Sequence, residues 1–137
     1  MKNIETRTDI KNLVHSFYNK IRKDDLLGPI FNGSIKEDNW PSHLEKLIDF
    51  WESNLFGIAK FRGNPPAAHQ NVDQKENYSI SQEHFGQWLK LWFETIDELF
   101  EGEIADKAKA RARRMSTGLY LAIWHKRPDH VKADEVN

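Results

Sequence analysis

Two histidines, His43 and His69, are the residues of this sequence best suited to chemistry. The chain has six histidines and no cysteine, so a metal ion has only imidazole and carboxylate ligands available. His69 follows two consecutive prolines and two alanines, and these small neighbours leave room for a broad molecule to approach the imidazole. Taken alone, His69 is still only a histidine in a loop.

His43 has a different setting. It precedes Leu47 by four residues and Phe50 by seven, so all three share one face of a helix. A histidine that shares a helical face with two large apolar residues is more often a core or boundary residue than a functional one. The remaining four histidines are expected at the surface: His15, His84, His125 and His130.

Tyr18 and Trp88 each place one hydrogen-bond donor on an apolar helical face. A buried donor without a partner is costly, so each needs a partner or a ligand. The chain also has 5 Trp, 8 Phe and 3 Tyr, which is a high aromatic content for a polar sequence. A filled aromatic core explains this composition, and a slot for a planar ligand is the sharper alternative.

Four helices are expected to position these side chains. Apolar residues at i, i+3, i+4, i+7 and i+8 predict a first helix over 10–21, preceded by Thr6 and Asp9 at capping-box spacing. Gly28-Pro29 is expected to end this region. The second helix is expected to start near 38–39 and to stop at Gly57.

Residues 61–66 are expected to form a loop, and a short helical turn that could begin at Pro65 would carry His69. Residues 71–79 are polar and predict no regular structure. The third helix is expected from Ser81 to Gly102, and the fourth over 104–125. One all-α domain, 1–137, is predicted, in which 1–7 and 127–137 are frayed tails. Helix-bundle and globin-like packing both fit this pattern.

The overall charge excludes some partners. The net charge is −1, so there is no electrostatic reason to expect nucleic acid or an anionic membrane surface as a partner. No apolar run approaches the roughly 20 residues of a membrane-spanning helix, and residues 1–9 have no apolar core of a signal peptide. We therefore expect a cytoplasmic protein, and a monomer.

In their order and spacing, several short motifs resemble the third subgroup of the bacterial truncated globins. They are Phe17-Tyr18-x-Lys-Ile-Arg-Lys-Asp, Leu27-Gly28-Pro29-Ile30-Phe31, His43 to Phe50-Trp51, Phe61-x-Gly63-Asn64-Pro65 to His69, and His84-Phe85-x-x-Trp88-Leu89. The resemblance covers about residues 8–125. It implies a two-over-two helical sandwich around haem b.

The resemblance also implies a role for individual residues. His69 would be the proximal iron ligand, and its other ring nitrogen would donate to a backbone carbonyl or to water. Tyr18, His43 and Trp88 would line the distal side. The candidates for apolar packing around the porphyrin are Phe17, Phe31, Leu47, Phe50, Trp51 and Trp92.

A globin of this kind is expected to bind O2, NO, CO or peroxide. Two distal donors favour tight oxygen binding with slow release, which suits nitric oxide dioxygenation or peroxide activation better than bulk oxygen transport. Turnover would need an unidentified electron donor or reductase, because the sequence has no flavin or nicotinamide motif. The alternatives are a cofactor-free helical interaction module and a non-haem metal protein that uses His43 and His69.

Overall fold

The computed structural model describes residues 1–136, and their side chains as far as residue 132. No strand occurs among these residues, so the all-α prediction is confirmed. The elements in chain order are α1 (Arg7–Lys23), α2 (Gly28–Ser34), the short 3-10 helix η1 (Glu37–Asn39), α3 (Trp40–Phe56), α4 (Pro65–Lys75), α5 (Gln82–Leu99), α6 (Glu103–Lys126) and α7 (Asp129–Val136).

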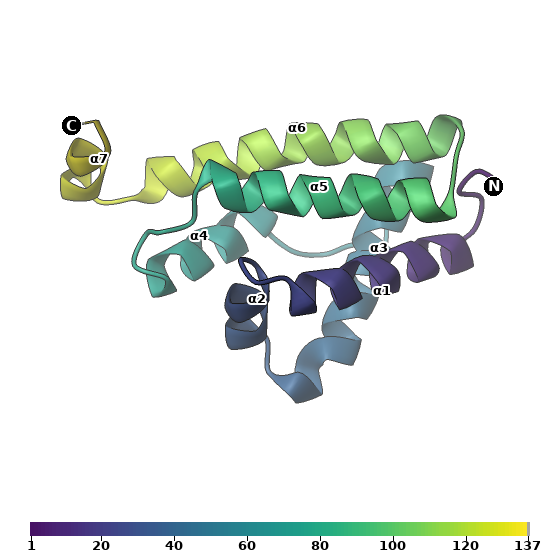
Figure 1. The fold of residues 1–137 in the computed structure, drawn as a ribbon, viewed down its shortest axis with the longest axis horizontal. Coiled ribbons are helices and arrows are strands. Elements are labelled where there is room, and N and C mark those ends of the chain that lie inside the picture. Colours follow the sequence, from purple (N-terminus) through teal and green to yellow (C-terminus); the bar gives the residue numbers. More distant parts are fainter. Residues whose placement is uncertain (137) are drawn as a thin grey trace.

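Four of the helices form two pairs, α1 with α3 and α5 with α6. Helices α5 and α6 lie side by side and antiparallel along the long axis of the molecule, as Figure 1 shows. Helix α1 packs against both α3 and α5, and so connects the two pairs. Helix α4 packs under the end of α6 that is distant from the α5–α6 turn. The two pairs therefore meet around the space between α1, α3, α4 and α5.

Local signals explain where the long helices begin and end. Thr6 and Asp9 form the predicted capping box at the start of α1, and Ser81 forms one with His84 at the start of α5. Gly57 ends α3 in the left-handed conformation with φ of 71°, which costs glycine little. These three boundaries agree with the sequence prediction.

Two segments differ from the prediction. Gly28-Pro29 begins helix α2 instead of closing a region, because proline suits the first turn of a helix, where its missing N–H is not needed. Asn32-Gly33, a pair typical of turns, also lies inside that helix. Helix α4 starts at Pro65 as expected but continues to Lys75, so the first part of the segment 71–79 is helical.

The N-terminal tail was predicted to be frayed, but the structure shows that it is packed. Ile4 is only 1% exposed and belongs to the main core. The Asn3 side-chain oxygen accepts hydrogen bonds from the backbone N–H groups of Ile104 and Ala105, at 3.0 and 3.1 Å. Residues 3 and 4 therefore fix the start of α6.

The C-terminal tail is also ordered where it begins. Arg127, predicted to be frayed, is buried, and the backbone of residues 129–136 is helical. Residue 137, the end of the predicted tail, lies outside the described residues.

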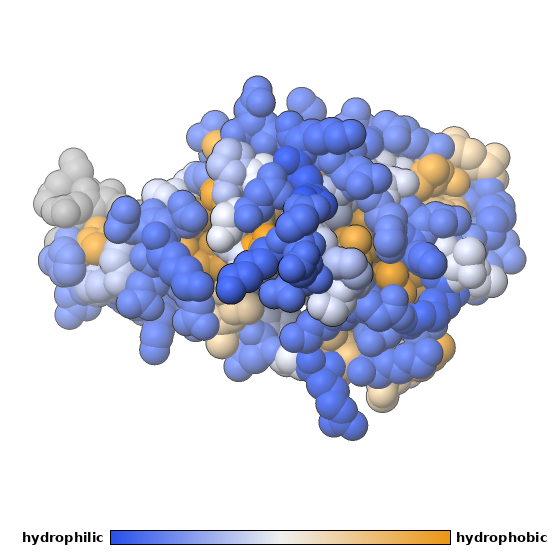
Figure 2. All heavy atoms as spheres, turned by 90° about the horizontal axis from the view of Figure 1, so that it is seen from below, coloured by the Kyte–Doolittle hydropathy of each residue, from blue (hydrophilic) through white to orange (hydrophobic). Residues whose placement is uncertain are grey.

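The core is dominated by aromatic and branched side chains from α1, α3 and α5. Trp51, Trp92 and Phe17 are its largest fully buried members. The surface in Figure 2 is mostly hydrophilic, with hydrophobic residues visible only in small areas between polar ones. Among the described residues, no helix has the length and apolar character needed to cross a membrane.

Candidate functional site

A cavity of about 330 Å³ lies between the helices, with walls from α1 to α6. This volume falls in the range of sites that bury a small ligand or a cofactor. The residues that line it are Tyr18, Leu27, Ile30, Phe31, Ser34, Ile35, His43, Leu47, Phe50, Trp51, Phe61, Pro65, Ala68, His69, Val72, Ile80, His84, Phe85, Trp88, Met115, Ser116, Leu119 and Ile123. None of these is Asp, Glu, Lys or Arg, so the cavity is apolar apart from a few neutral polar groups.

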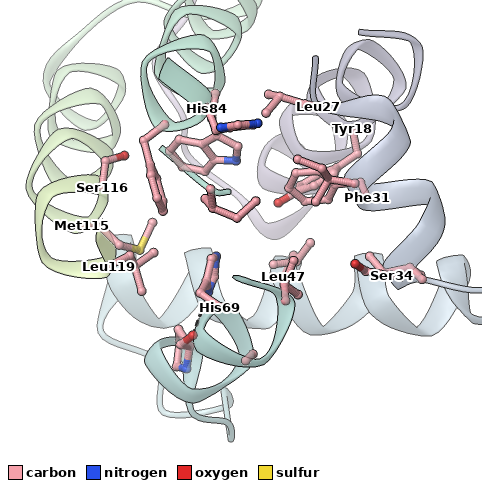
Figure 3. A pocket seen from close by; sticks show the side chains of 18 of the residues that line it. Tyr18, Leu27, Phe31, Ser34, Leu47, His69, His84, Met115, Ser116 and Leu119 are labelled. Carbon is pink, nitrogen blue, oxygen red and sulfur yellow. Dashed lines mark hydrogen bonds between the residues drawn. The ribbon is translucent and has the colours of Figure 1, made fainter. Parts of the chain in front are cut away.

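His69 projects from α4 into this cavity, as Figure 3 shows. Its Nδ1 lies 2.7 Å from the backbone carbonyl oxygen of Pro65, one helical turn earlier. A carbonyl oxygen only accepts hydrogen bonds, so Nδ1 carries the proton and donates it. Nε2 is therefore left with a free lone pair, which is the arrangement of a histidine prepared to ligate a metal.

Burial keeps the His69 imidazole neutral. It lowers the pKa of His69 below its ordinary value, and this effect outweighs the hydrogen bond to Pro65, which acts in the opposite direction. The hydrogen bond to the Pro65 carbonyl holds the ring, and the Phe85 ring lies roughly parallel to it, with 6.4 Å between the ring centres. A neutral imidazole of fixed orientation is the form that binds iron.

Three polar side chains line the cavity from α1, α3 and α5. The Tyr18 hydroxyl is buried, which raises its pKa, and the neighbouring Trp88 indole N–H acts on that pKa in the opposite direction. His43 packs edge-on against Tyr18, with ring centres 6.3 Å apart. Its pKa is lowered mainly by burial, with a smaller contribution from the positive charge of Lys46. Proton donors from three helices thus converge on one space.

Of the predicted apolar residues, Phe31, Leu47, Phe50 and Trp51 line the cavity, and Phe17 and Trp92 do not. Phe17 and Trp92 were predicted to pack around the porphyrin, and the structure places them behind the cavity wall instead of on it. Trp92 lies in a second layer, stacked on Trp51 at 4.6 Å and on Trp88 at 5.9 Å, and its indole N–H donates to the Ala108 carbonyl oxygen.

Phe17 also lies in this second layer. It packs edge-on against Tyr18, Trp88 and Trp92, with ring centres 4.8, 5.3 and 4.9 Å apart. The second layer therefore holds the cavity wall rigid from behind.

The sequence analysis missed several lining residues, and His84 is the clearest case. It was expected at the surface, yet it is partly buried and lines the cavity. Its Nδ1 accepts a hydrogen bond from the backbone N–H of Ser81 at 3.0 Å. The spacing Ser81-x-x-His84 was the available signal, because a side chain at that position of a capping box is held in place.

Ser116 was also missed. It lines the cavity from α6, and its buried hydroxyl oxygen has no hydrogen-bond partner among the described residues. A buried hydroxyl without a partner is unfavourable unless a ligand completes it. Met115 and Leu119 lie on the same side of the cavity (Figure 3).

Comparison with known proteins identifies the class. The chain is 33% identical over 110 residues to "Group 3 truncated hemoglobin ctb" of Campylobacter jejuni, covering 79% of this chain and 83% of that protein. It also superimposes on the crystal structure of a group III truncated hemoglobin from Campylobacter jejuni with a TM-score of 0.77. That match has 31% identity and covers 87% of this chain and 92% of the other. No family model matches the sequence.

The fold and the site thus define a globin of the truncated class. More narrowly, the chain belongs to the group 3 truncated hemoglobins. This result confirms the predicted family and fold class. Membership implies a haem cofactor and small gaseous ligands.

The residues present fit such a cofactor. The cavity has aromatic walls, the neutral His69 with a free Nε2, and the buried Ser116 hydroxyl, which has no hydrogen-bond partner among the described residues. By contrast, no group of three His, Asp or Glu side chains among the described residues is placed to hold a bare metal ion.

Proposed function

We propose that this protein holds haem b through Nε2 of His69 and binds O2, NO, CO or peroxide on the opposite side of the cavity. The observation that carries the proposal is the hydrogen bond from His69 Nδ1 to the Pro65 carbonyl, because it leaves Nε2 free inside an apolar cavity. The apolar packing residues are Phe31, Leu47, Phe50 and Trp51. When bound, the haem iron supplies reversible binding of diatomic gases and one-electron redox chemistry.

The side chains of Tyr18 and Trp88 then act on the gaseous ligand. Both are donors in a cavity without charged residues, where a hydrogen bond to an oxygen atom with partial negative charge is stronger than in water. The raised pKa of Tyr18 keeps its proton in place as a donor. We therefore infer that oxygen binds tightly and leaves slowly.

His43 supplies the third polar group. Its lowered pKa keeps the ring neutral, so it is able to accept a proton or donate one. Such a group assists O–O bond cleavage or the reaction of oxygen with nitric oxide. These polar groups favour nitric oxide dioxygenation or peroxide activation over bulk oxygen transport, with electrons supplied by a separate donor or reductase.

The two alternatives have less support. A cofactor-free interaction module would use its aromatic residues to fill the core, whereas here they surround a cavity of about 330 Å³. A non-haem centre would have only His43 and His69 as ligands, and the described residues offer no third side chain for such a site.

A haem titration tests the proposal. The pyridine haemochrome spectrum of the protein purified with its own haem establishes the haem type, and apoprotein is then titrated with haemin while the Soret band is recorded. We expect one haem b per chain in the wild type, and loss of the proximal-ligand spectrum in His69→Gly with recovery on addition of imidazole. His15→Gly, a change at an exposed histidine, is the matched control and should titrate like the wild type. A wild-type spectrum in His69→Gly without imidazole would refute the assignment.

A further inference from the structure

We propose that a buried ion pair, Asp73 with Arg127, is a positioning device for His69. The two residues are predicted to set the orientation of α4 and thereby the direction of His69 Nε2. This inference rests on the proposed haem ligation by His69. Neither Asp73 nor Arg127 lines the cavity that holds His69.

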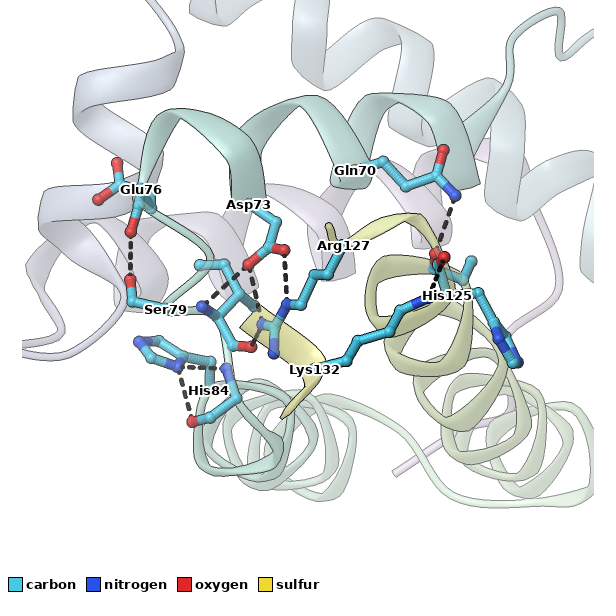
Figure 4. Close-up of polar contacts among 11 residues, drawn as sticks. Gln70, Asp73, Glu76, Ser79, His84, His125, Arg127 and Lys132 are labelled. Atoms are coloured by element: carbon cyan, nitrogen blue, oxygen red, sulfur yellow. Dashed lines mark hydrogen bonds and ion pairs between the residues drawn. The ribbon is translucent and has the colours of Figure 1, made fainter. Parts of the chain in front are cut away.

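The pair is bidentate and fully enclosed. Arg127 Nε donates to Asp73 Oδ2 and Arg127 Nη2 donates to Asp73 Oδ1, both at 3.0 Å. Their side chains are only 1% and 2% exposed. Figure 4 shows Arg127 extending from the end of α6 to Asp73 on α4. We call the two parallel hydrogen bonds from the Arg127 guanidinium to the Asp73 carboxylate the fork. The fork joins two helices that meet at the cavity.

The same groups also hold the connection to α5. Arg127 Nη2 donates to the Ile80 carbonyl oxygen at 2.6 Å, and the Ile80 N–H donates to Asp73 Oδ1 at 3.1 Å. Ile80 itself lines the cavity. Three elements, α4, the segment before α5 and the end of α6, thus meet at one buried centre. We call this centre the Asp73 clamp, and it consists of Asp73, Ile80 and Arg127.

The backbone next to the clamp is strained, which indicates that the clamp determines its shape. Asn77 and Tyr78 are consecutive residues in the left-handed region, with φ of 57° and 61°. Asparagine tolerates this conformation, whereas tyrosine adopts it rarely and with strain. The Tyr78 N–H donates to the Asp73 carbonyl oxygen at 2.7 Å, so Asp73 contacts the strained segment through its backbone as well.

Helix α4 packs against α6, and the contacts of the Asp73 clamp fix how it is turned there. Residues 57–60 and 62–64, in the loop before it, are exposed, and two of its first residues are prolines. Asp73 lies one turn after His69 on the same helix, and Gln70 adds a second tie through its hydrogen bond to the Ala122 carbonyl oxygen at 2.9 Å. A small rotation of α4 would therefore carry the His69 imidazole with it.

Stability alone does not explain the pair. Replacing a buried ion pair by apolar residues of similar volume is often neutral or stabilising, because desolvation offsets the attraction between the charges. What the apolar replacement lacks is the fixed direction of the fork and its hydrogen bonds to Ile80. Orientation of α4 is thus the property that should respond when the pair is removed.

The test compares two kinds of variant in the haem-loaded protein. Arg127→Lys keeps the charge but loses the fork, and the double variant Asp73→Leu with Arg127→Met removes both charges together and so protects folding. Glu52→Gln is the matched control: Glu52 is a buried carboxylate on α3, 4% exposed, paired with Arg7 at 2.8 Å and Lys60 at 3.0 Å, away from α4.

Two readouts are measured: the iron–histidine stretching band in resonance Raman spectra of the ferrous protein, and the rate of haem transfer to an excess of a haem-scavenging protein. We expect both clamp variants to show a shifted or broadened band and about tenfold faster haem transfer, the usual size of effect when a group that orients a metal ligand is lost. Glu52→Gln should lower the melting temperature but leave the band unchanged.

The outcomes separate this inference from the function on which it rests. A wild-type protein without an iron–histidine band would overturn the haem ligation itself, and the inference with it. A normal wild-type band that persists unchanged in both clamp variants would overturn the positioning role alone and leave the proposed function intact.

Discussion

Tyr18 and Trp88 carry the chemistry of the proposed gas-binding side, and their donors set the first prediction. Removing one hydrogen bond of this kind costs about 1.5 kcal/mol, so Tyr18→Phe and Trp88→Leu should each raise the oxygen dissociation rate about tenfold. Stopped-flow displacement of oxygen by CO measures this rate. Tyr120→Phe, at a tyrosine outside the cavity lining, is the control and should have little effect. Unchanged rates in both cavity variants would contradict the assignment of these donors.

The buried histidines predict a pH dependence of apoprotein stability. Burial lowers the pKa of His69 and of His43 below the ordinary value of 6.5. As pH falls below about 6.5, the unfolded chain takes up protons that the folded chain does not, so the free energy of unfolding decreases on acidification. For His69 the slope has an upper limit of about 1.4 kcal/mol per pH unit.

Urea unfolding of the apoprotein between pH 5 and pH 7.5 measures this slope. His69→Gln should reduce it, whereas His15→Gln, at an exposed position, should not. Identical slopes for wild type and His69→Gln would show that burial of this imidazole carries no proton-linked cost.

For individual residues, the sequence predicted which helical faces are apolar and point inward. It did not predict which residues of those faces line the cavity. Tyr18 and Trp88 were singled out because they lie on apolar stripes, and both line the cavity. Phe17 and Trp92 lie on the same stripes, and only the three-dimensional packing sends them into the second layer. Ser116 gave no signal, because its exposure depends on how α6 is rotated.

Among the elements, the close contact between α1 and α2 gives a further prediction. A Cβ on Gly28 would lie 2.8 Å from the Arg22 carbonyl oxygen, which is backbone and has little freedom to move. Gly28→Ala should therefore destabilise the protein by about 2 kcal/mol and displace α2, which lines the cavity through Phe31. Denaturant midpoints measure the effect.

The matched control for that change is Gly86→Ala inside α5. A Cβ there meets nothing within 4 Å, and alanine favours the helix by about 0.5–1 kcal/mol. Equal stability of Gly28→Ala and Gly86→Ala would show that α2 does not need the close approach.

The elements also show why some helices were predictable and others were not. The helices α1, α3, α5 and α6 have long apolar stripes and clear end signals such as Thr6 and Gly57. Helix α2 begins at Gly28-Pro29, a pair that marks a turn as readily as a helix start. The second half of α4 is polar, and its buried Asp73 pairs with Arg127, a residue 54 positions away, so no local apolar pattern reveals the helix.

At the scale of the whole molecule, the cavity separates the helices that would otherwise form one core. Haem that binds the folded chain and not the unfolded chain should stabilise the fold. At a free haem concentration one hundred times the dissociation constant, the gain is about 3 kcal/mol, or a rise of about 10 °C in Tm. Thermal unfolding of apoprotein and haem-loaded protein, followed by far-UV circular dichroism, measures the difference. Equal Tm values would mean that the cavity is not where haem binds.

A crystal structure of the chain grown with haem is the most direct measurement of the central claim. We predict that the iron lies on Nε2 of His69, that Nδ1 keeps its hydrogen bond to the Pro65 carbonyl oxygen, and that Tyr18 and Trp88 face the other side of the porphyrin. A structure in which the His69 imidazole points to solvent, or in which haem is absent from the cavity, would contradict it.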